Sequence, residues 1–403
     1  MVKRIENGSV TTPLGFQACG IAAGIKVGRD DMAVVFSDVP ATAAALFTSN
    51  TACAAPVILD RETVAGGVIR AIVANAGCAN AGTGPDGMQD ARDMAAAAAA
   101  ALGVPASQVL VASTGVIGRR LPMDRIRAGI AAGAKALSRD GGIAASRAIL
   151  TTDTHDKRSC VQVDIGGRTV TVAGMCKGAG MIEPNLATML AFLTTDANIP
   201  DAALLRSALK AAADKSFNRV TVDGDQSTND SLFLLANGVS GAPALDAASP
   251  DWPAFVEALE TVCLDLAKEI AGDGEGATKF VTVRVCGAPS NEIALRAAKA
   301  IANSPLVKTA WFGGDPNWGR IFSAVGDAGT PFDPARLRIL FDDAAVYDRG
   351  KIADEAMLAE LERICSQKTF AVTVDLDEGP GDETVYTCDL SYEYVKINGE
   401  YTT

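Results

Sequence analysis

The amino-acid sequence predicts an α/β protein in which mixed sheets and flanking helices form a layered sandwich. Strand-like and helical segments alternate along the 403 residues, without a regular β-α-β repeat. A chain of this length can bury a core of two or more layers and form two subdomains. Glycine-rich polar loops connect the segments, and loops held on a rigid scaffold often contain binding residues.

Apolar alternation and short apolar runs predict the strands. Residues 161–175, VQVDIGGRTVTVAGM, predict a hairpin that turns at Gly166-Gly167. The run Met-Leu-Ala-Phe-Leu from residue 189 predicts a buried strand closed by Thr195 and Asp196. The other predicted strands cover 31–39, 43–49, 68–76, 279–288, 337–343, 370–377 and 384–397.

Apolar residues at helical spacing predict the helices. Gly103 and Gly272 follow two of these segments at the point where the periodicity ends, as glycine often does at a helix C-terminus. The predicted helices cover 91–103, 122–137, 200–216, 253–274, 291–305 and 355–367.

Composition and charge predict a cytoplasmic protein. The formal net charge is −12 and no cluster of lysine or arginine exceeds two residues, which argues against nucleic acid or an anionic membrane as a partner. No apolar segment approaches the roughly 18–20 residues that span a bilayer, and MVKRIENGSV lacks the apolar core of a signal peptide. The nine cysteines contain no CxxC pair, which is typical of reduced, buried thiols.

The single histidine, His155, excludes several kinds of site. Zinc sites built on two or three histidines are ruled out, although a carboxylate-rich metal site is not. A hydrolase triad would have to use His155, which lies in the polar segment TTDTHDKRS and has the pattern of a solvated loop residue. No Walker A loop or strand-to-helix GxGxxG is present, so nucleotide binding is not expected.

Thr188, in the segment EPNLATMLAF, is a candidate nucleophile. A threonine at a newly formed N-terminus can use its own α-amine as the base, because the reference pKa of that amine is near ~8. The small Ala187 before it would let the hydroxyl reach the preceding carbonyl in an N-to-O acyl shift. The residues alone leave a second interpretation open, in which Thr188 only fills a β-friendly position at the head of a strand.

The segment KGAGMIEPNLATMLAFLTTDA, residues 177–197, resembles the self-cleavage segment of the ornithine acetyltransferase family. These are the bifunctional glutamate N-acetyltransferases of arginine biosynthesis. The resemblance covers the whole chain, and its motifs occur in order: GFQACGIAAGIK, NAGCANAGTG, STGVIG, ILTTDT, TVDGDQSTND, GDGEGATK, GGDPNWGRI and YVKINGEYTT. It implies a self-processing enzyme that resembles the N-terminal-nucleophile class.

The resemblance implies self-cleavage between Ala187 and Thr188, giving an α chain of residues 1–187 and a β chain of residues 188–403. Thr188 would then accept an acetyl group from N2-acetylornithine and pass it to glutamate in a ping-pong reaction. Thr114 and Gly115 would form the oxyanion hole. The substrate contacts implied by the resemblance are Thr154, Lys177, Thr188, Glu275, Asn398 and Thr403.

Charge complementarity gives two of these residues a physical reason. Lys177 would suit a substrate carboxylate, and Glu275 would suit the ammonium of N-acetylornithine. The plain alternatives are a solvated loop lysine, a capping glutamate and, for Asn398 and Thr403, a frayed tail.

The resemblance implies no metal and no bound cofactor, and it leaves open whether acetyl-CoA is a second acetyl donor. It also implies an assembly of two α and two β chains. One competing interpretation is a self-processing amidase or aminopeptidase, which would pass the acyl group to water. Another is a small-molecule binding protein without catalysis.

Overall fold

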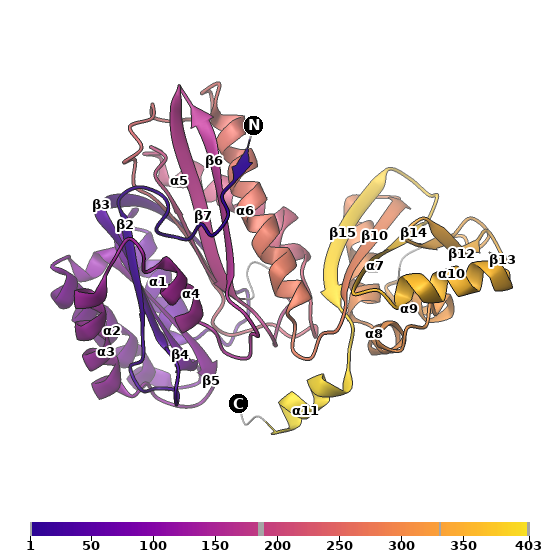
Figure 1. Cartoon of the computed structure of the whole chain (residues 1–403), viewed down its shortest axis with the longest axis horizontal. Helices are drawn as coiled ribbons and strands as arrows, with labels where there is room; N and C mark the ends of the chain where they lie inside the picture. The colour runs from indigo at the N-terminus through magenta and orange to yellow at the C-terminus, as the bar shows by residue number, and fades with distance from the viewer. Residues whose placement is uncertain (1, 184–188, 330–331, 401–403) are drawn as a thin grey trace.

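The computed structural model describes residues 2–183, 189–329 and 332–400, which form two lobes (Figure 1). A nine-stranded sheet builds the larger lobe and a six-stranded sheet builds the smaller one. Helix α11 (Tyr392–Glu400) follows the smaller lobe and extends back toward the larger one. Within the described ranges, no helix combines the length and apolarity needed to cross a bilayer.

The larger sheet has the strand order β1-β6-β7-β8-β9-β3-β4-β5, and β2 also pairs with β3. Its pairing is mixed, since β8 runs parallel to β9 but antiparallel to β7. The strands are β1 (Lys3–Arg4), β2 (Phe16–Ile21), β3 (Met32–Phe47), β4 (Val68–Cys78), β5 (Val109–Val116), β6 (Lys157–Ile165), β7 (Arg168–Lys177), β8 (Leu190–Thr195) and β9 (Ser231–Ala236).

Strand β3 divides this sheet into two layers. Its register with β4 shifts between Phe36 and Ala41, and its second half pairs with β9. One face of each half encloses a common buried core, so the sheet folds over on itself. Members of that core are Ala33, Val35, Ala43, Ala45, Ile72, Ala74, Leu110, Ala112, Phe192 and Phe233.

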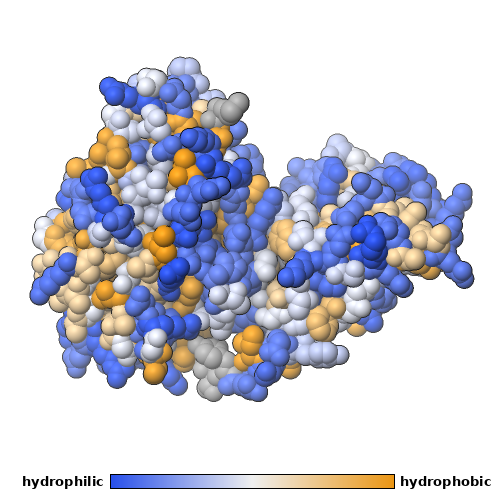
Figure 2. Space-filling view, in the orientation of Figure 1, coloured by the Kyte–Doolittle hydropathy of each residue, from blue (hydrophilic) through white to orange (hydrophobic). Residues whose placement is uncertain are grey.

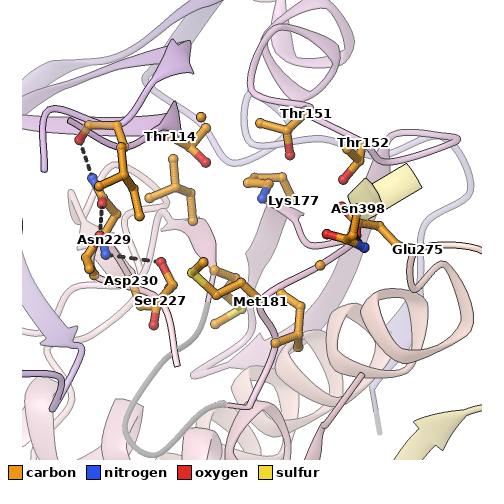
Figure 3. Close-up of a pocket in the computed structure, with 18 residues that line it drawn as sticks. Thr114, Thr151, Thr152, Lys177, Met181, Ser227, Asn229, Asp230, Glu275 and Asn398 are labelled. Carbon is orange, nitrogen blue, oxygen red and sulfur yellow. Dashed lines mark hydrogen bonds between the residues drawn. The ribbon is translucent and has the colours of Figure 1, made fainter. Parts of the chain in front are cut away.

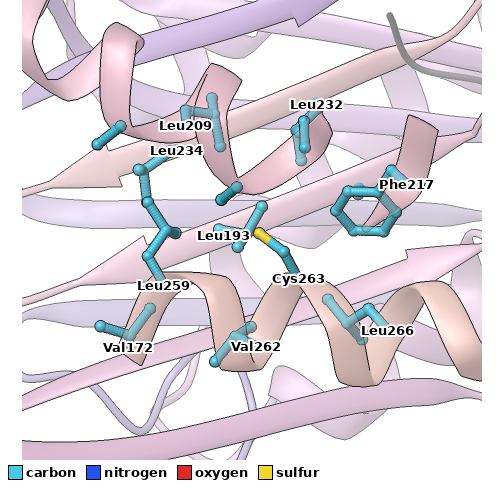
Figure 4. Close-up of a cluster of buried hydrophobic side chains, with 14 of the residues drawn as sticks. Val172, Leu193, Leu209, Phe217, Leu232, Leu234, Leu259, Val262, Cys263 and Leu266 are labelled. Atoms are coloured by element: carbon cyan, nitrogen blue, oxygen red, sulfur yellow. The ribbon is translucent and has the colours of Figure 1, made fainter. Parts of the chain in front are cut away.

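Helices cover both outer faces of this double layer. Helices α2 (Gly84–Leu102) and α3 (Met123–Ala136) pack on the β4–β5 half. Helices α5 (Ala202–Lys215) and α6 (Trp252–Gly272) pack on the β7–β9 half through leucine, valine and cysteine side chains (Figure 4). The lobe is therefore a four-layer sandwich, and the predicted layered α/β class is confirmed.

The smaller sheet has the order β13-β12-β11-β14-β10-β15. Its strands are β10 (Phe280–Ala288), β11 (Arg338–Phe341), β12 (Ala344–Asp348), β13 (Lys351–Ile352), β14 (Thr369–Asp375) and β15 (Gly381–Cys388). The remaining helices of the molecule are α1 (Ala55–Val64), α4 (Gly142–Ala148), α7 (Asn291–Asn303), α8 (Pro305–Phe312), α9 (Trp318–Asp327) and α10 (Glu355–Cys365), with 3-10 turns at Ala106–Gln108 and Phe217–Arg219. Hydrophilic residues cover much of the face shown in Figure 2, which is notched between the lobes.

Most predicted elements are present, with two instructive differences. The hairpin at Gly166-Gly167 forms as β6 and β7, and the run from residue 189 is the buried strand β8. The predicted strands 31–39 and 43–49 are one continuous strand, β3. The prediction for 384–397 is wrong beyond Cys388, because Ser391 accepts a hydrogen bond from the Glu393 N–H at the start of helix α11.

The predicted division at residue 188 does not follow the lobes. Strands β1 to β7 precede it, whereas β8 and β9 follow it and pair into the same sheet. Cleavage between residues 187 and 188 would therefore leave both fragments within one sheet and one core.

Candidate active site

A cavity lies where β5, β7 and β8 reach the same end of the larger lobe (Figure 3). Its lining combines hydroxyl, amide and charged groups with a few apolar side chains. The lining residues are Ala79, Thr114, Gly115, Ile117, Thr151, Thr152, Lys177, Gly180, Met181, Ile182, Met189, Leu190, Ser227, Thr228, Asn229, Asp230, Glu275 and Asn398.

Thr114 and Gly115 enter the cavity near the end of β5. Gly115 has φ of +126°, and a Cβ there would lie 2.4 Å from the carbonyl carbon of Gly77, so only glycine fits without strain. Asn229 fixes this end of the strand, because its side-chain amide donates to the Ser113 carbonyl at 2.9 Å. Within the described residues, the Thr114 hydroxyl makes no hydrogen bond. It is thus available as a donor to a ligand.

Lys177 is the last residue of β7 and its ammonium is directed into the cavity (Figure 3). The residue is only 7% exposed. No ion pair or hydrogen bond to its ammonium occurs in the part of the chain that the structure describes. Because a buried charge is costly without a partner, this position favours an anionic ligand.

Asp230 and Asn229 line the cavity from the other side, and the sequence did not single them out. The Asp230 carboxyl is buried and its Oδ2 has no hydrogen-bond partner. Burial raises the pKa of Asp230 well above its usual range, although Ser227 and Lys177 oppose this shift. Burial thus disfavours the charged form of Asp230, whereas the nearby Lys177 favours it.

Glu275 and Asn398 meet at the cavity from distant parts of the sequence. The Asn398 side-chain amide donates to Glu275 Oε2 at 2.7 Å, and the Glu275 backbone N–H donates to the Ala179 carbonyl at 3.0 Å. Helix α11 thereby brings the C-terminal segment to the cavity, and Asn398 does not belong to a frayed tail.

The backbone before residue 184 is held in an unusual conformation. Ala179 and Met181 have φ of 91° and 57°, a region that non-glycine residues seldom adopt and that costs energy. The Asp223 carboxylate accepts hydrogen bonds from the Met181 and Ile182 N–H groups at 2.7 and 2.9 Å. The Tyr394 hydroxyl of α11 donates to the same carboxylate at 3.1 Å. Asp223, which sequence reasoning missed, thus joins this strained segment to the C-terminal helix.

Thr154 does not line the cavity, whereas its neighbours Thr151 and Thr152 do. The Thr154 N–H donates to Asp273 at 3.0 Å, and its hydroxyl donates to the same carboxylate. The structure thus shows Thr154 bound to Asp273, and its predicted contact with substrate stays a prediction. His155 beside it is half exposed and lies next to the Glu269 and Asp273 carboxylates.

A buried ion network underlies the Thr151–Thr154 loop. The Lys157 ammonium donates to Asp153 at 2.7 Å and to Asp273 at 2.5 Å. Burial alone would raise the pKa of Asp153, but Lys177, Lys157 and the Gly178 N–H lower it to about 2. The loop is consequently anchored by Asp153 in its ionised form, paired with Lys157.

Thr154→Val is expected to lower the free energy of unfolding by about 1–3 kcal/mol, because it leaves Asp273 without a hydroxyl donor in a buried network. If Thr154 acts only through Asp273, the substrate KM should stay unchanged. Chemical denaturation and steady-state kinetics measure the two effects, with Thr152→Val as the matched control inside the cavity lining. An increased KM at full stability for Thr154→Val would instead establish direct contact with substrate.

The cleavage-site residues Ala187 and Thr188 and the terminal Thr403 lie outside the described residues. Met189, which follows Thr188 in the chain, and the next residue, Leu190, line the cavity. Among the described residues, no cluster of histidine, cysteine or carboxylate side chains is arranged to hold a metal ion.

The larger lobe is a four-layer α/β sandwich, and its cavity has the hydroxyl, amide and charged groups that a small polar ligand needs. The chain belongs to the ArgJ family, whose model matches residues 17–403. The predicted class, an acyltransferase of arginine biosynthesis, is thereby confirmed.

Relatives match over almost the whole chain. The arginine biosynthesis bifunctional protein ArgJ of Symbiobacterium thermophilum is 50% identical over 98% of this chain and 99% of its own. The protein of the same name from Geobacillus kaustophilus is 45% identical over 100% of this chain and 98% of its own. A solved structure, ornithine acetyltransferase from Mycobacterium tuberculosis complexed with ornithine, is 42% identical and covers 46% of this chain and 100% of its own, with a TM-score of 0.44.

Proposed function

We propose that this enzyme transfers an acetyl group from N2-acetylornithine to glutamate through an acetyl-Thr188 intermediate. The observation that carries the proposal is the composition of one cavity. Ile182 and Met189, which lie on either side of residues 183–188, line it together with Thr114, Lys177 and Glu275. A nucleophile in that segment would thus have hydrogen-bond donors, a cation and an anion in its surroundings.

Maturation begins with an N-to-O acyl shift. The Thr188 hydroxyl attacks the carbonyl of Ala187 and displaces the Thr188 amine. An ester then joins the Ala187 carbonyl to the Thr188 oxygen. Water then hydrolyses the ester and leaves a free α-amine on Thr188.

In the first half-reaction, the Thr188 α-amine takes the proton from its own hydroxyl and the oxygen attacks the acetyl carbonyl of N-acetylornithine. Negative charge develops on the carbonyl oxygen, where the Thr114 hydroxyl and the Gly115 N–H can stabilise it. The C–N bond then breaks, the leaving amine receives the proton, and ornithine departs from acetyl-Thr188.

In the second half-reaction, the neutral α-amine of glutamate attacks the acetyl ester. The same two donors stabilise the oxyanion, the bond to the Thr188 oxygen breaks, and the proton returns to that oxygen. N-acetylglutamate is released. The sequence of steps uses no metal or bound cofactor and takes place in the cytoplasm; two α and two β chains form the enzyme.

Charged residues distinguish the ends of the donor. Lys177 binds the α-carboxylate, and Glu275 binds the side-chain ammonium. Because a hydrogen bond to a charged partner contributes about 1.5–3 kcal/mol, Glu275→Gln should raise the N-acetylornithine requirement about ten- to a hundred-fold. In this variant, the discharge of acetyl-Thr188 by glutamate should be slowed less, because the glutamate side chain has no ammonium.

The two half-reactions of Glu275→Gln can be measured separately, by mass spectrometry of acetyl-Thr188 formation and decay. Asn398→Asp is the variant for comparison. It removes the amide that donates to Glu275 and keeps the Glu275 carboxylate itself. Equal losses in both half-reactions would mean that Glu275 supports the cavity as a whole.

The proposal is tested by incubating the pure protein with N-acetylornithine, with and without glutamate. A transferase releases ornithine continuously only when glutamate is present. Continuous release without glutamate would identify the self-processing amidase or aminopeptidase, and no release in either case would identify a binding protein.

A further inference from the structure

A second cavity adjoins the first at the Thr151–Thr152 loop. It is lined by Lys26, Val27, Arg29, Gly77, Thr151 and Thr152. Both threonines also line the first cavity, so the two spaces share one wall. Lys26 and Arg29 lie in the loop between β2 and β3.

Close packing places Lys26 beside the donor at Gly115. A Cβ on Gly77 would lie 2.9 Å from Cγ of Lys26, and a Cβ on Gly115 would lie 2.4 Å from the carbonyl carbon of Gly77. The aliphatic part of Lys26 is therefore separated from Gly115 by the backbone of a single glycine. The two cavities meet at Thr151 and Thr152, which line both of them. Lys177 of the first cavity is close enough for its charge to help lower the pKa of Lys26.

The loop that holds these cations is fixed to the body of the protein. The buried Asp31 carboxylate accepts hydrogen bonds from the Ala23 and Lys26 N–H groups at 2.6 and 2.7 Å. The Lys26 ammonium donates to the Leu150 carbonyl at 2.6 Å, and the Arg29 guanidinium donates to the Thr151 carbonyl at 2.7 Å. Both cations are thus held beside the Thr151–Thr152 loop by hydrogen bonds to uncharged backbone carbonyls.

Neither cation is neutralised by an ion pair. Across residues 2–183, 189–329 and 332–400, no carboxylate lies within ion-pair distance of Lys26 or Arg29. Burial and the nearby Arg29 lower the pKa of Lys26 to about 8, against opposing effects of Asp31 and Asp153. An ammonium has three donors and a guanidinium has five, so both retain donors for an anion.

The proposed reaction raises a problem of charge that this cavity can solve. N-acetylornithine presents a side-chain ammonium, whereas glutamate presents a second carboxylate. Glu275 would attract the first and repel the second, since like charges that are not screened by water oppose each other strongly. The acceptor therefore needs a cationic position for its side chain that is separate from Glu275.

We propose that Lys26 and Arg29 form an acceptor subsite that binds the side-chain carboxylate of glutamate while Lys177 binds its α-carboxylate. This inference rests on the proposed acetyl transfer. It divides the substrates by charge: the donor side chain lies toward Glu275, and the acceptor side chain lies toward Lys26 and Arg29. A phosphate of acetyl-CoA has similar anionic chemistry and is the competing occupant.

The test compares glutamate with glutamine, its neutral isostere, as acceptors for acetyl-Thr188 that N-acetylornithine has formed. Arg29→Gln and Lys26→Gln should each lower kcat/KM for glutamate about ten- to a hundred-fold, the range for a hydrogen bond to a charged group. Discharge by glutamine and acetylation by N-acetylornithine should not change. Lys26→Arg should restore most of the preference for glutamate.

Arg206→Gln is the matched control, because Arg206 lines a separate groove beside α5; it should behave as wild type. Arg29 is exposed, so Arg29→Gln should fold normally. It therefore provides the test even if Lys26→Gln folds poorly. An unchanged preference for glutamate in Arg29→Gln and Lys26→Gln would overturn the subsite. If these variants lost only the acetylation of the enzyme by acetyl-CoA, the cations would bind a phosphate of acetyl-CoA, and the glutamate subsite would likewise be overturned. Wild-type protein that forms no acetyl-Thr188 would overturn the proposed function and the subsite together.

Discussion

Thr188→Ala is expected to remain a single chain of 403 residues and to have no detectable acetyltransferase activity. The substitution removes the hydroxyl that performs the acyl shift and the later attack on N-acetylornithine, so both processes stop. Wild-type protein should separate into two fragments on a denaturing gel. N-terminal sequencing of the second fragment should begin at Thr188.

Thr188→Ser is the control, because it keeps a hydroxyl and should still be processed. The wild-type fragments should elute together from a sizing column under native conditions. The reason is that β8 pairs with β7 on one side and β9 on the other, so two chains would share the sheet. A second fragment that began at another residue, or full activity in Thr188→Ala, would contradict the assignment of the nucleophile.

The sequence predicted the layered class well because strong local patterns determine it. The hairpin at Gly166-Gly167 and the buried run of β8 are recognisable from alternation and apolarity alone. The bend in β3 is not, because it depends on pairing with β9, almost two hundred residues away in the chain. The two layers of the sandwich arise from that bend.

The error at residues 389–397, which were predicted to continue the strand, also has a tertiary cause. Its tyrosine, valine and isoleucine residues favour a strand when local preference is considered alone. In the structure, the Ser391 hydroxyl donates to the Gly276 carbonyl at 2.5 Å and accepts from the Glu393 N–H. These contacts fix the start of α11 and bring Asn398 to Glu275.

The candidate-site residues that lie within recognisable sequence motifs could be predicted from the sequence. Thr114, Gly115, Lys177, Glu275 and Asn398 all line one cavity, although their roles stay predictions. Asp223, which holds the segment before residue 184, and Asn229, which holds the end of β5, were not found because their importance lies in long-range hydrogen bonds. Thr151, Thr152 and Asp230 were missed because only the folded chain brings them to the cavity lining.

Thr114→Val should slow acetylation of Thr188 by N-acetylornithine about 10²- to 10³-fold, the usual effect of removing one oxyanion donor. Valine has almost the same shape as threonine and suits a β-strand. The loss should therefore appear in kcat and not in stability, since the Thr114 hydroxyl has no hydrogen bond within the described residues.

Single-turnover formation of acetyl-Thr188 measures this effect, with thermal unfolding as the check on folding. Thr114→Ser keeps the hydroxyl and should retain most of the wild-type rate. Self-cleavage of Thr114→Val should also slow if the donor that stabilises the acetyl oxyanion stabilises the tetrahedral intermediate at Ala187. Full acetylation activity in Thr114→Val would contradict the role of the Thr114 hydroxyl. The oxyanion donor from β5 would then be the Gly115 N–H, whose position does not depend on residue 114 because Gly77 packs closely against Gly115.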